Sequence, residues 1–212
     1  MKIKDLLLEV PLPADWDKTV YRPQTSFAQR IRYAQERAAK MGTGSSRVAF
    51  EIPFEGRSTI LKVARNKKGM AQNEYEAQML NDYYVTGLGI TIPIIDYDEE
   101  HDQPTWIHTE KADKMTPSLF KKYFNGLNPN EVMELVTHMI GRVRHELPPE
   151  TIEKYQEIYD SNETINSLVD LVGNYDIAGA DFARVANWGV YNNEPVIIDI
   201  GASTEIIKQH YS

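Results

Sequence analysis

The chain has 212 residues, of which 42% are hydrophobic and 10% aromatic, enough apolar material for one domain or for two small lobes. These proportions exclude disorder, collagen and coiled coil as descriptions of the whole chain. No apolar run approaches the roughly 20 residues of a membrane helix, and Asp5 and Glu9 interrupt any secretory apolar region. The absence of cysteine excludes disulfides, a cysteine-ligated metal and a thiol nucleophile. We therefore expect a cytoplasmic chain with no membrane partner.

The net charge of −8 is distributed unevenly along the chain. Residues 1–68 carry 14 Lys and Arg against 7 Asp and Glu, a net charge of +7, whereas residues 69–212 carry 9 against 24, a net charge of −15. This division argues against general binding to nucleic acid by the whole molecule. It suits a site in which a cationic part binds a polyphosphate and an acidic part holds a metal ion. An unevenly charged, solvated surface explains it equally well.

The first 44 residues are expected to form an irregular segment followed by a helix. Three prolines punctuate residues 1–23. Thr25 or Ser26 can cap a helix that runs to about Lys40, and Gly42-Thr-Gly44 would end it.

A hairpin is predicted next, with strands over 47–54 and 58–65 and a turn at Glu55-Gly56. Its second strand places Lys62 among β-branched and apolar residues, an unusual position for an ammonium group. Taken alone, Lys62 could be an edge-strand lysine that discourages aggregation.

A helix is predicted over residues 70–84, and one of its faces is apolar. Glu76 falls in the middle of that face, while Glu74 points the opposite way. A carboxylate on a core-facing stripe needs a partner, so Glu76 is the residue to explain. The stripe consists of Tyr75, Met79, Leu80 and Tyr83.

The rest of the chain is predicted to be two more strands, a helical region and a closing hairpin. The tail changes character at Asn187-Trp-Gly-Val-Tyr, which is followed by a turn and by a short apolar strand that ends on Asp199. The strands are expected at 91–97 and 105–109, and the helices at about 132–143, at 151–159 and from a cap at Ser161 to about Gly173.

Four features thus occur in order: a glycine-rich turn, a lysine in a strand, a core-facing glutamate, and a late Asn and Asp pair. Each has an ordinary structural explanation alone, such as a helix stop, a turn residue or a strand end. Their order and spacing change the interpretation. Gly42 precedes Lys62 by 20 residues, Lys62 precedes Glu76 by 14, and Asn187 precedes Asp199 by 12.

In this order the sequence resembles the protein-kinase-like fold over roughly residues 40–201. Gly42-Thr-Gly44-Ser-Ser-Arg-Val48 resembles the glycine-rich loop, and Ile60-Leu-Lys62-Val the third-strand motif whose lysine pairs with nucleotide phosphates and with a helix glutamate. Glu76-Ala-Gln-Met-Leu80 is similar to that helix. Asn187 resembles the metal-binding asparagine of the catalytic loop, and Asp199-Ile-Gly201 the Asp-Phe-Gly triplet. The compact form is most similar to small kinase-like proteins encoded by bacteriophages.

The resemblance implies ATP and Mg²⁺ as cofactors. Lys62, held by Glu76, would contact the phosphates, and Gly42 and Gly44 would let backbone N–H groups approach them. Backbone groups from Glu110 to Ala112 would meet the adenine, and Asn187 and Asp199 would ligate Mg²⁺. Because only Glu76 shares the apolar stripe, we expect it to face Lys62 and Glu74 to face solvent.

Three departures from the family's pattern stand out. Ser45-Ser46-Arg47 occupies the place of the third glycine, which affects closure over the γ-phosphate. The catalytic base belongs five residues before Asn187, at Phe182, whereas Asp181 lies six before; a one-residue insertion would make Asp181 the base. Eleven residues follow Gly201, fewer than an activation segment and peptide-binding helices need, so we expect a truncated C-lobe.

Other site types find less support. His138 and His145 are seven residues apart but have no third ligand for zinc. No Gly-x-Ser-x-Gly elbow is present for a hydrolase. The basic residues between Arg30 and Lys40 have few interleaved aromatics, so a solvated helix face explains them better than a nucleic-acid site.

The expected fold is α+β and two-lobed: an N-terminal extension and helix (1–41), a β-rich nucleotide-binding lobe (42–112) and a truncated helical lobe (113–212), with ATP between the lobes. The expected function is that of an atypical kinase-like phosphotransferase, with Asp181 and Lys62 as catalytic residues. The alternative is a pseudokinase that binds or inhibits a protein in the host cell without catalysis. A structural protein that kept the fold and lost the pocket is a third possibility.

Overall fold

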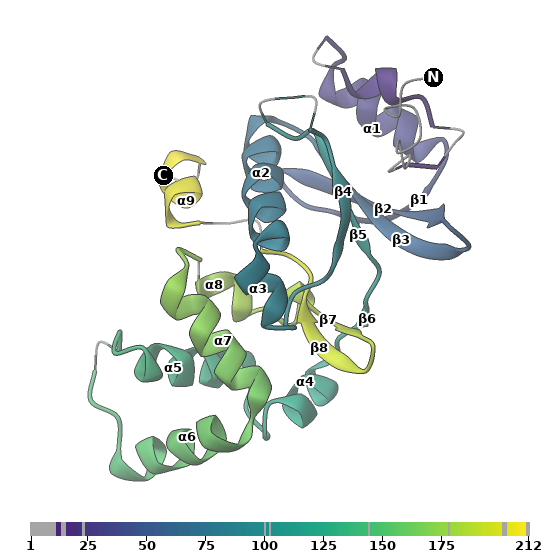
Figure 1. Cartoon of the computed structure of the whole chain (residues 1–212). Coiled ribbons are helices and arrows are strands. Elements are labelled where there is room, and N and C mark those ends of the chain that lie inside the picture. The colour runs from purple at the N-terminus through teal and green to yellow at the C-terminus, as the bar shows by residue number, and fades with distance from the viewer. Residues whose placement is uncertain are drawn as a thin grey trace, which may run out of the picture. The chain divides into compact units, whose positions relative to one another are not determined.

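The computed structural model describes residues 12–13, 16–22, 24–99, 101, 103–143, 145–177, 179–200 and 203–210 (Figure 1). Contacts divide the chain into two compact units. Unit 1 comprises Met1–Ala77 and Pro93–Lys111, and unit 2 comprises Gln78–Ile92 and Ala112–Ser212. Unit 1 carries a five-stranded sheet, and unit 2 carries most of the helices and a small sheet. The chain is therefore α+β, as the sequence predicted.

The sheet of unit 1 is antiparallel throughout, with the strand order β1-β2-β3-β5-β4. The predicted β2–β3 hairpin is confirmed. Its two-residue turn is Glu55-Gly56, and both residues have positive φ (49° and 78°), as such a turn requires. The strands are β1 (Ala39–Thr43), β2 (Arg47–Phe54), β3 (Arg57–Ala64), β4 (Ile94–Tyr97) and β5 (Trp106–Glu110).

The helix expected to reach Lys40 ends earlier, so that prediction is wrong at its C-terminal end. α1 spans Phe27–Gln35 and starts at the predicted cap, Ser26, which forms a capping box with Gln29. Ala39 and Lys40 instead pair with β2 as the start of β1. As a strand, this segment forms backbone hydrogen bonds with β2, which it could not form if the helix continued through it. The boundary expected at residues 41/42 therefore falls inside a strand.

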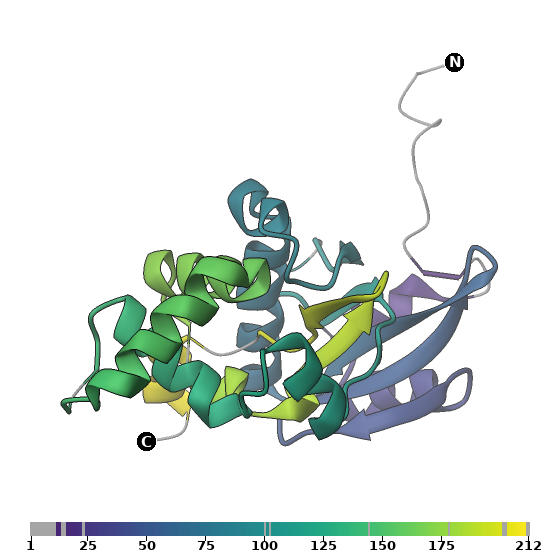
Figure 2. The same cartoon turned by 90° about the horizontal axis from the view of Figure 1, so that it is seen from below.

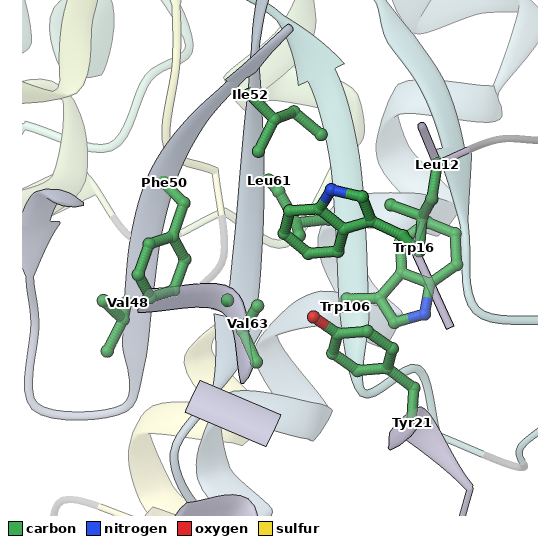
Figure 3. Packing of buried hydrophobic residues seen from close by; sticks show 10 residues of the cluster. Leu12, Trp16, Tyr21, Val48, Phe50, Ile52, Leu61, Val63 and Trp106 are labelled. Atoms are coloured by element: carbon green, nitrogen blue, oxygen red, sulfur yellow. The ribbon is translucent and has the colours of Figure 1, made fainter. Parts of the chain in front are cut away.

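One face of this sheet is covered by the segment that precedes it (Figure 3). Side chains alternate along a strand, so Val48 and Phe50 of β2 and Leu61 and Val63 of β3 share that face. Figure 3 shows Trp16 and Tyr21 of the N-terminal segment and Trp106 of β5 on the side of Leu61 and Val63. The cluster consists of Leu12, Trp16, Tyr21, Ala34, Val48, Phe50, Ile52, Leu61, Val63 and Trp106.

The helix predicted over 70–84 is two helices, α2 (Lys67–Asn81) and α3 (Tyr83–Gly87). Asp82 adopts an extended conformation between them and caps α3, accepting bonds from the backbone N–H groups of Tyr84 and Val85. Because the helix breaks at Asp82, the regular arrangement of side chains around α2 does not continue to Tyr83. Tyr83 is consequently 93% exposed, and its placement on the apolar stripe was wrong.

Unit 2 contains helices and a three-stranded sheet in the order β6-β7-β8, which Figure 2 shows from below. Asn162, and not Ser161 as expected, caps α7; Ser161 ends α6. The helices are α4 (Pro117–Tyr123), α5 (Pro129–Met139), α6 (Pro149–Ser161), α7 (Glu163–Asn174), α8 (Gly179–Phe182), the 3₁₀ turn η3 (Val185–Asn187) and α9 (Thr204–His210). The strands are β6 (Asp113–Lys114), β7 (Trp188–Tyr191) and β8 (Glu194–Ile197).

The β7–β8 hairpin is anchored in unit 2 through Trp188, which is buried. Its ring meets Phe120 and Phe124 edge-on, with centroids 5.7 and 5.0 Å apart, and Phe182 lies 6.4 Å away. At the far end of the hairpin, Asn192 and Asn193 take the two positive-φ positions of the turn.

Within the described part of the chain, no helix is both long and apolar enough to cross a membrane.

Candidate functional site

The register of the β2–β3 hairpin brings two cationic side chains to one face of the sheet. Lys62 of β3 lies opposite Ala49 of β2, and Arg47 is two residues from Ala49 on the same strand. Because neighbouring side chains alternate, Arg47 and Lys62 face away from the cluster that contains Val48 and Phe50. This is the face on which α2 lies.

The ion pair expected between Lys62 and Glu76 is present. Lys62 Nζ lies 2.5 Å from Glu76 Oε1, and the Glu76 side chain is fully buried. Glu74 is half-buried and accepts a hydrogen bond from Gln103 Nε2 at 3.0 Å, so it is less exposed than expected. The facing predicted for Glu76 is confirmed, and Met79 and Leu80 of the apolar stripe are buried as well. The buried carboxylate thus has the partner that its burial requires.

Glu76 also forms an ion pair with a second cation, Arg47, which the sequence analysis did not predict. Arg47 Nη1 donates to Glu76 Oε2 and also to Asn73 Oδ1, at 3.3 Å in the latter case. Asn73 is fully buried and in turn donates to the Pro104 carbonyl oxygen at 3.1 Å. The sequence held a signal for this: Arg47 alternates with Val48 and Phe50, so its side chain had to lie on the face of Lys62.

The glycine-rich turn joins β1 to β2 and is tied to the start of α2. The Gly44 N–H donates to the Arg47 carbonyl oxygen at 2.9 Å and closes the turn. Arg65 and Asn66, between β3 and α2, hold the turn's carbonyl groups. Arg65 Nη1 donates to Gly44 O (2.7 Å), Asn66 Nδ2 to Ser45 O (3.2 Å) and the Arg65 N–H to Ser46 O (2.7 Å), while Ser46 Oγ donates to Gln72 Oε1.

Neither glycine of this turn is required by the surrounding protein. A Cβ atom added at Gly42 would meet nothing within 4 Å, and one at Gly44 would lie 3.5 Å from the Arg47 carbonyl oxygen, an ordinary contact. Gly42 belongs to β1, next to an irregularity in the β1–β2 register. The space beside both positions is consistent with the predicted approach of a ligand to the backbone, and that role stays a prediction.

The segment expected to meet adenine begins at the end of β5. The Glu110 N–H donates to the Pro93 carbonyl oxygen at 3.0 Å, and its carboxylate accepts two bonds from the Arg57 guanidinium. Unit 1 ends at Lys111, and Ala112 begins the second part of unit 2. An added Cβ at Gly189 would lie 2.5 Å from Ala112 Cβ, so Ala112 packs directly on the β7 backbone.

In unit 2 the hairpin brings Asn187 and Asp199 to the same end. Asn187 precedes β7, Asp199 follows β8, and the Asn187 carbonyl oxygen accepts a hydrogen bond from the Ile198 N–H at 2.8 Å. Asp199 is half-buried. Gly201, which completes the Asp-x-Gly triplet, lies outside the described residues.

The loop before β7 is closed by two side chains that each bond a carbonyl oxygen six residues earlier. Asn187 Nδ2 donates to Asp181 O and Trp188 Nε1 donates to Phe182 O, both at 3.0 Å. Phe182, at the family's base position, is fully buried, whereas Asp181 is half-buried in α8.

The donor set of Asn187 and Asp199 suits Mg²⁺. Mg²⁺ is bound through one or two protein oxygens plus phosphates and water, and seldom by an all-protein cage. The amide nitrogen of Asn187 is used in its bond to Asp181 O, so its oxygen Oδ1 is the atom that can ligate. Among the described residues, no group of three His, Asp or Glu side chains is placed to hold a metal ion.

No protein-family model and no curated protein matches the sequence. Among solved structures, the chain is similar to the aminoglycoside phosphotransferase APH(4)-Ia and to two thermostable mutants of it, in ternary complexes of hygromycin B with ADP or with AMP-PNP. Each alignment has 17% identity and a TM-score of 0.28. It covers 50% of this chain and 33% of the other, so the chain spans about a third of that enzyme's length.

Proposed function

We propose that the chain is an atypical kinase-like phosphotransferase that binds Mg-ATP and transfers the γ-phosphate to an acceptor hydroxyl. The observation that carries the proposal is the buried ion pair of Lys62 on β3 with Glu76 on the helix that follows. In protein kinases a lysine on the third strand and a glutamate of the next helix form this pair and hold the nucleotide phosphates. The end-of-hairpin positions of Asn187 and Asp199 are a second, independent support.

In this proposal each residue takes the role that the resemblance implies for it. Lys62 binds the α/β-phosphates, and Glu76 fixes its position. Asn187 and Asp199 hold Mg²⁺, which supplies neutralisation of phosphate charge when bound. Asp181 accepts the proton of the acceptor hydroxyl. The backbone at Gly42 and Gly44 approaches the phosphates, and that between Glu110 and Ala112 approaches the adenine.

The competing proposal is a pseudokinase that binds nucleotide or a partner protein without catalysis. Two observations favour it: Asp181 is one residue out of the family's register, and the glycine-rich turn is fastened to Arg65 and Asn66. The likeness to bacteriophage-encoded proteins, the protein partner and the cytoplasmic setting stay predictions.

Thermal unfolding with and without Mg-ATP tests nucleotide binding. A ligand that binds only the folded state stabilises it by about 2.7 kcal/mol at a hundred times its Kd, so millimolar Mg-ATP is expected to raise the melting temperature. Lys62→Ala should abolish much of that rise and should still fold, because Arg47 continues to neutralise Glu76.

The exposed Lys122 of α4 offers a matched control, and Lys122→Ala should behave as the unchanged protein does. An unchanged melting temperature in millimolar Mg-ATP would overturn the enzyme proposal. A clear rise without any transfer or hydrolysis of the γ-phosphate would favour the pseudokinase.

A further inference from the structure

Glu76 uses its two carboxylate oxygens for two different cations. Oε1 accepts the Lys62 ammonium and Oε2 accepts the Arg47 guanidinium. All three side chains are buried or nearly so: Glu76 is 0% exposed, Arg47 8% and Lys62 9%. Loss of the counter-ion from a buried carboxylate is strongly destabilising. Lys62 can therefore turn toward a ligand only if another cation continues to neutralise Glu76.

We propose that Arg47 is a positioning residue that keeps Glu76 neutralised while Lys62 turns to a phosphate oxygen. The inference rests on the proposed function and deepens it. With Oε2 held by Arg47, the Lys62 ammonium can turn part of its hydrogen bonding toward a phosphate without leaving the carboxylate uncompensated. Arg47 thereby acts through Glu76 and Lys62 and needs no contact with the nucleotide.

Arg47 is itself held in place from two sides. Its guanidinium donates to Asn73 Oδ1, and Asn73 is fixed by its bond to the Pro104 carbonyl oxygen. Its backbone carbonyl accepts the Gly44 N–H that closes the glycine-rich turn. A planar guanidinium with several donors suits this position better than an ammonium, because it can hold Glu76 and Asn73 at once. Arg47 therefore joins the turn, β2 and α2 in one network.

The test is the affinity of the purified protein for Mg-ATP and for inorganic tripolyphosphate, measured by calorimetry. Arg47→Met keeps the length of the side chain and removes its charge, and it should weaken both ligands about tenfold or more, a loss typical of a broken buried charge pair. Arg47→Lys should recover much of the affinity. Arg32→Met removes an exposed arginine of α1 that lies outside the candidate site, and it should change neither affinity by more than about twofold.

A double variant separates positioning from a merely structural role. In the E76Q background no carboxylate needs a counter-ion, so adding R47M should leave the affinity for both ligands unchanged, and the two effects should be strongly non-additive. Arg47→Met should still fold, because Lys62 continues to neutralise Glu76, and Arg47→Lys keeps the test available if it does not. If R47M weakens binding equally in both backgrounds, Arg47 contacts the phosphates directly and the positioning role is overturned.

The outcomes distinguish this inference from the function on which it rests. If the unchanged protein binds Mg-ATP and Arg47→Met binds it equally well, the inference fails and the proposed function stands. If the protein binds tripolyphosphate in an Arg47-dependent manner but shows no preference for ATP, the inference stands and the nucleotide function fails. Binding of neither ligand overturns both.

Discussion

Asp181 and Asn187 are joined by one hydrogen bond, but it uses the Asp181 backbone and not its carboxylate. Asn187 Nδ2 bonds Asp181 O, so deletion of the Asp181 carboxylate leaves this closure of the loop intact. A general base acts on the acceptor hydroxyl as the transition state forms and contributes little to binding of the first substrate. Removal of the carboxylate therefore leaves this hydrogen bond in place while it tests the proposed base.

We expect Asp181→Ala to lower turnover by a factor on the order of 10²–10⁴ and to leave ATP affinity nearly unchanged. ATP hydrolysis and ATP affinity measured on the same preparation check this. The exposed Asp170 of α7 provides the control, and Asp170→Ala should alter neither quantity. Equal turnover in Asp181→Ala and the unchanged protein would remove Asp181 as the base and leave it as a turn residue.

Asp199 is expected to behave differently because its role is in metal binding. Asp199→Asn keeps the shape of the side chain and removes a charged oxygen ligand, and Mg²⁺ prefers charged oxygens. ATP affinity should fall in the presence of Mg²⁺ and should change little in the presence of a chelator. Titration of Asp199→Asn and of the unchanged protein with ATP, once with Mg²⁺ and once with the chelator, measures both affinities. An equal loss of ATP affinity under the two conditions would show that Asp199 does not bind the metal.

Among single residues, the ones whose pairing could be predicted from the sequence are charged residues in apolar surroundings. Lys62 in an apolar strand and Glu76 on an apolar helix face each needed a partner, and the structure pairs them. The pairing of Arg47 with Glu76 was not predicted, because strand alternation places Arg47 on the face of Lys62 but does not show which carboxylate it meets. Tyr83 was misplaced because helical phase cannot be continued through a cap such as Asp82.

At the scale of elements, the glycine-rich turn and the first turn of α2 are in unusually close contact. Gly69 lies in that first turn, and a Cβ atom added to it would stand 2.1 Å from the Ser46 carbonyl oxygen. That same oxygen accepts the Arg65 N–H. The connection between β3 and α2 is so short that the helix begins directly against the turn. The turn is therefore supported by backbone contacts with the start of α2 and with the residue that follows β3.

We expect Gly69→Ala to destabilise the protein by about 1–3 kcal/mol, the usual cost of overpacking a tight contact. Gly87→Ala is the matched control, since Gly87 also lies in a helix but its Cβ would meet nothing within 4 Å. There the substitution should be neutral or stabilising by up to about 1 kcal/mol. Denaturant unfolding of both variants measures the difference, and a Gly69→Ala variant as stable as Gly87→Ala would show that the turn yields easily.

The β2–β3 hairpin has a strong local pattern and was predicted, whereas β1 depends on pairing and was not. The β2–β3 hairpin has its turn residues and alternation within 20 residues, and its bounds were found to within one residue. β1 has exposed residues throughout and gains its strand conformation only from pairing with β2, so nothing local distinguished it from a frayed helix end.

At the scale of the whole molecule, the basic charge of residues 1–68 is not simply a solvated surface. Arg47 and Lys62 are buried around Glu76, and Arg30 of α1 is 3% exposed. Arg30 donates from Nη2 to the Arg22 carbonyl oxygen at 2.8 Å, and burial lowers its pKa, with Asp98 opposing that effect. Three of the cations in this part of the chain are therefore structural or belong to the candidate site. Composition could not assign them, because it records charge and not burial.

The segment that covers the sheet of unit 1 also makes a pH-dependent contribution to stability. Tyr21 is buried in the cluster of Figure 3, and its hydroxyl has no hydrogen-bond partner among the described residues. Burial raises the pKa of this phenol far above its ordinary value of 10.0. The folded state therefore keeps the Tyr21 proton at a pH at which the unfolded chain has lost it. By linkage, the stabilisation is fully present below about pH 10 and is lost as the pH rises further.

We expect Tyr21→Phe to flatten the alkaline decline of stability above pH 10. Phenylalanine preserves the edge-on contacts of the ring with Tyr33 and Trp106 and removes a hydroxyl that has no hydrogen-bond partner in the described part of the chain. At pH 7 the variant should therefore be as stable as the unchanged protein or more stable, by about 1 kcal/mol.

Urea unfolding between pH 7 and pH 11, followed by tryptophan fluorescence, measures both effects. Tyr83→Phe, which removes a hydroxyl that lies in solvent, controls for the loss of a phenol. Parallel pH profiles for Tyr21→Phe and the unchanged protein would mean that the Tyr21 hydroxyl reaches water in the folded state, and that the N-terminal segment covers the sheet less tightly than its contacts indicate.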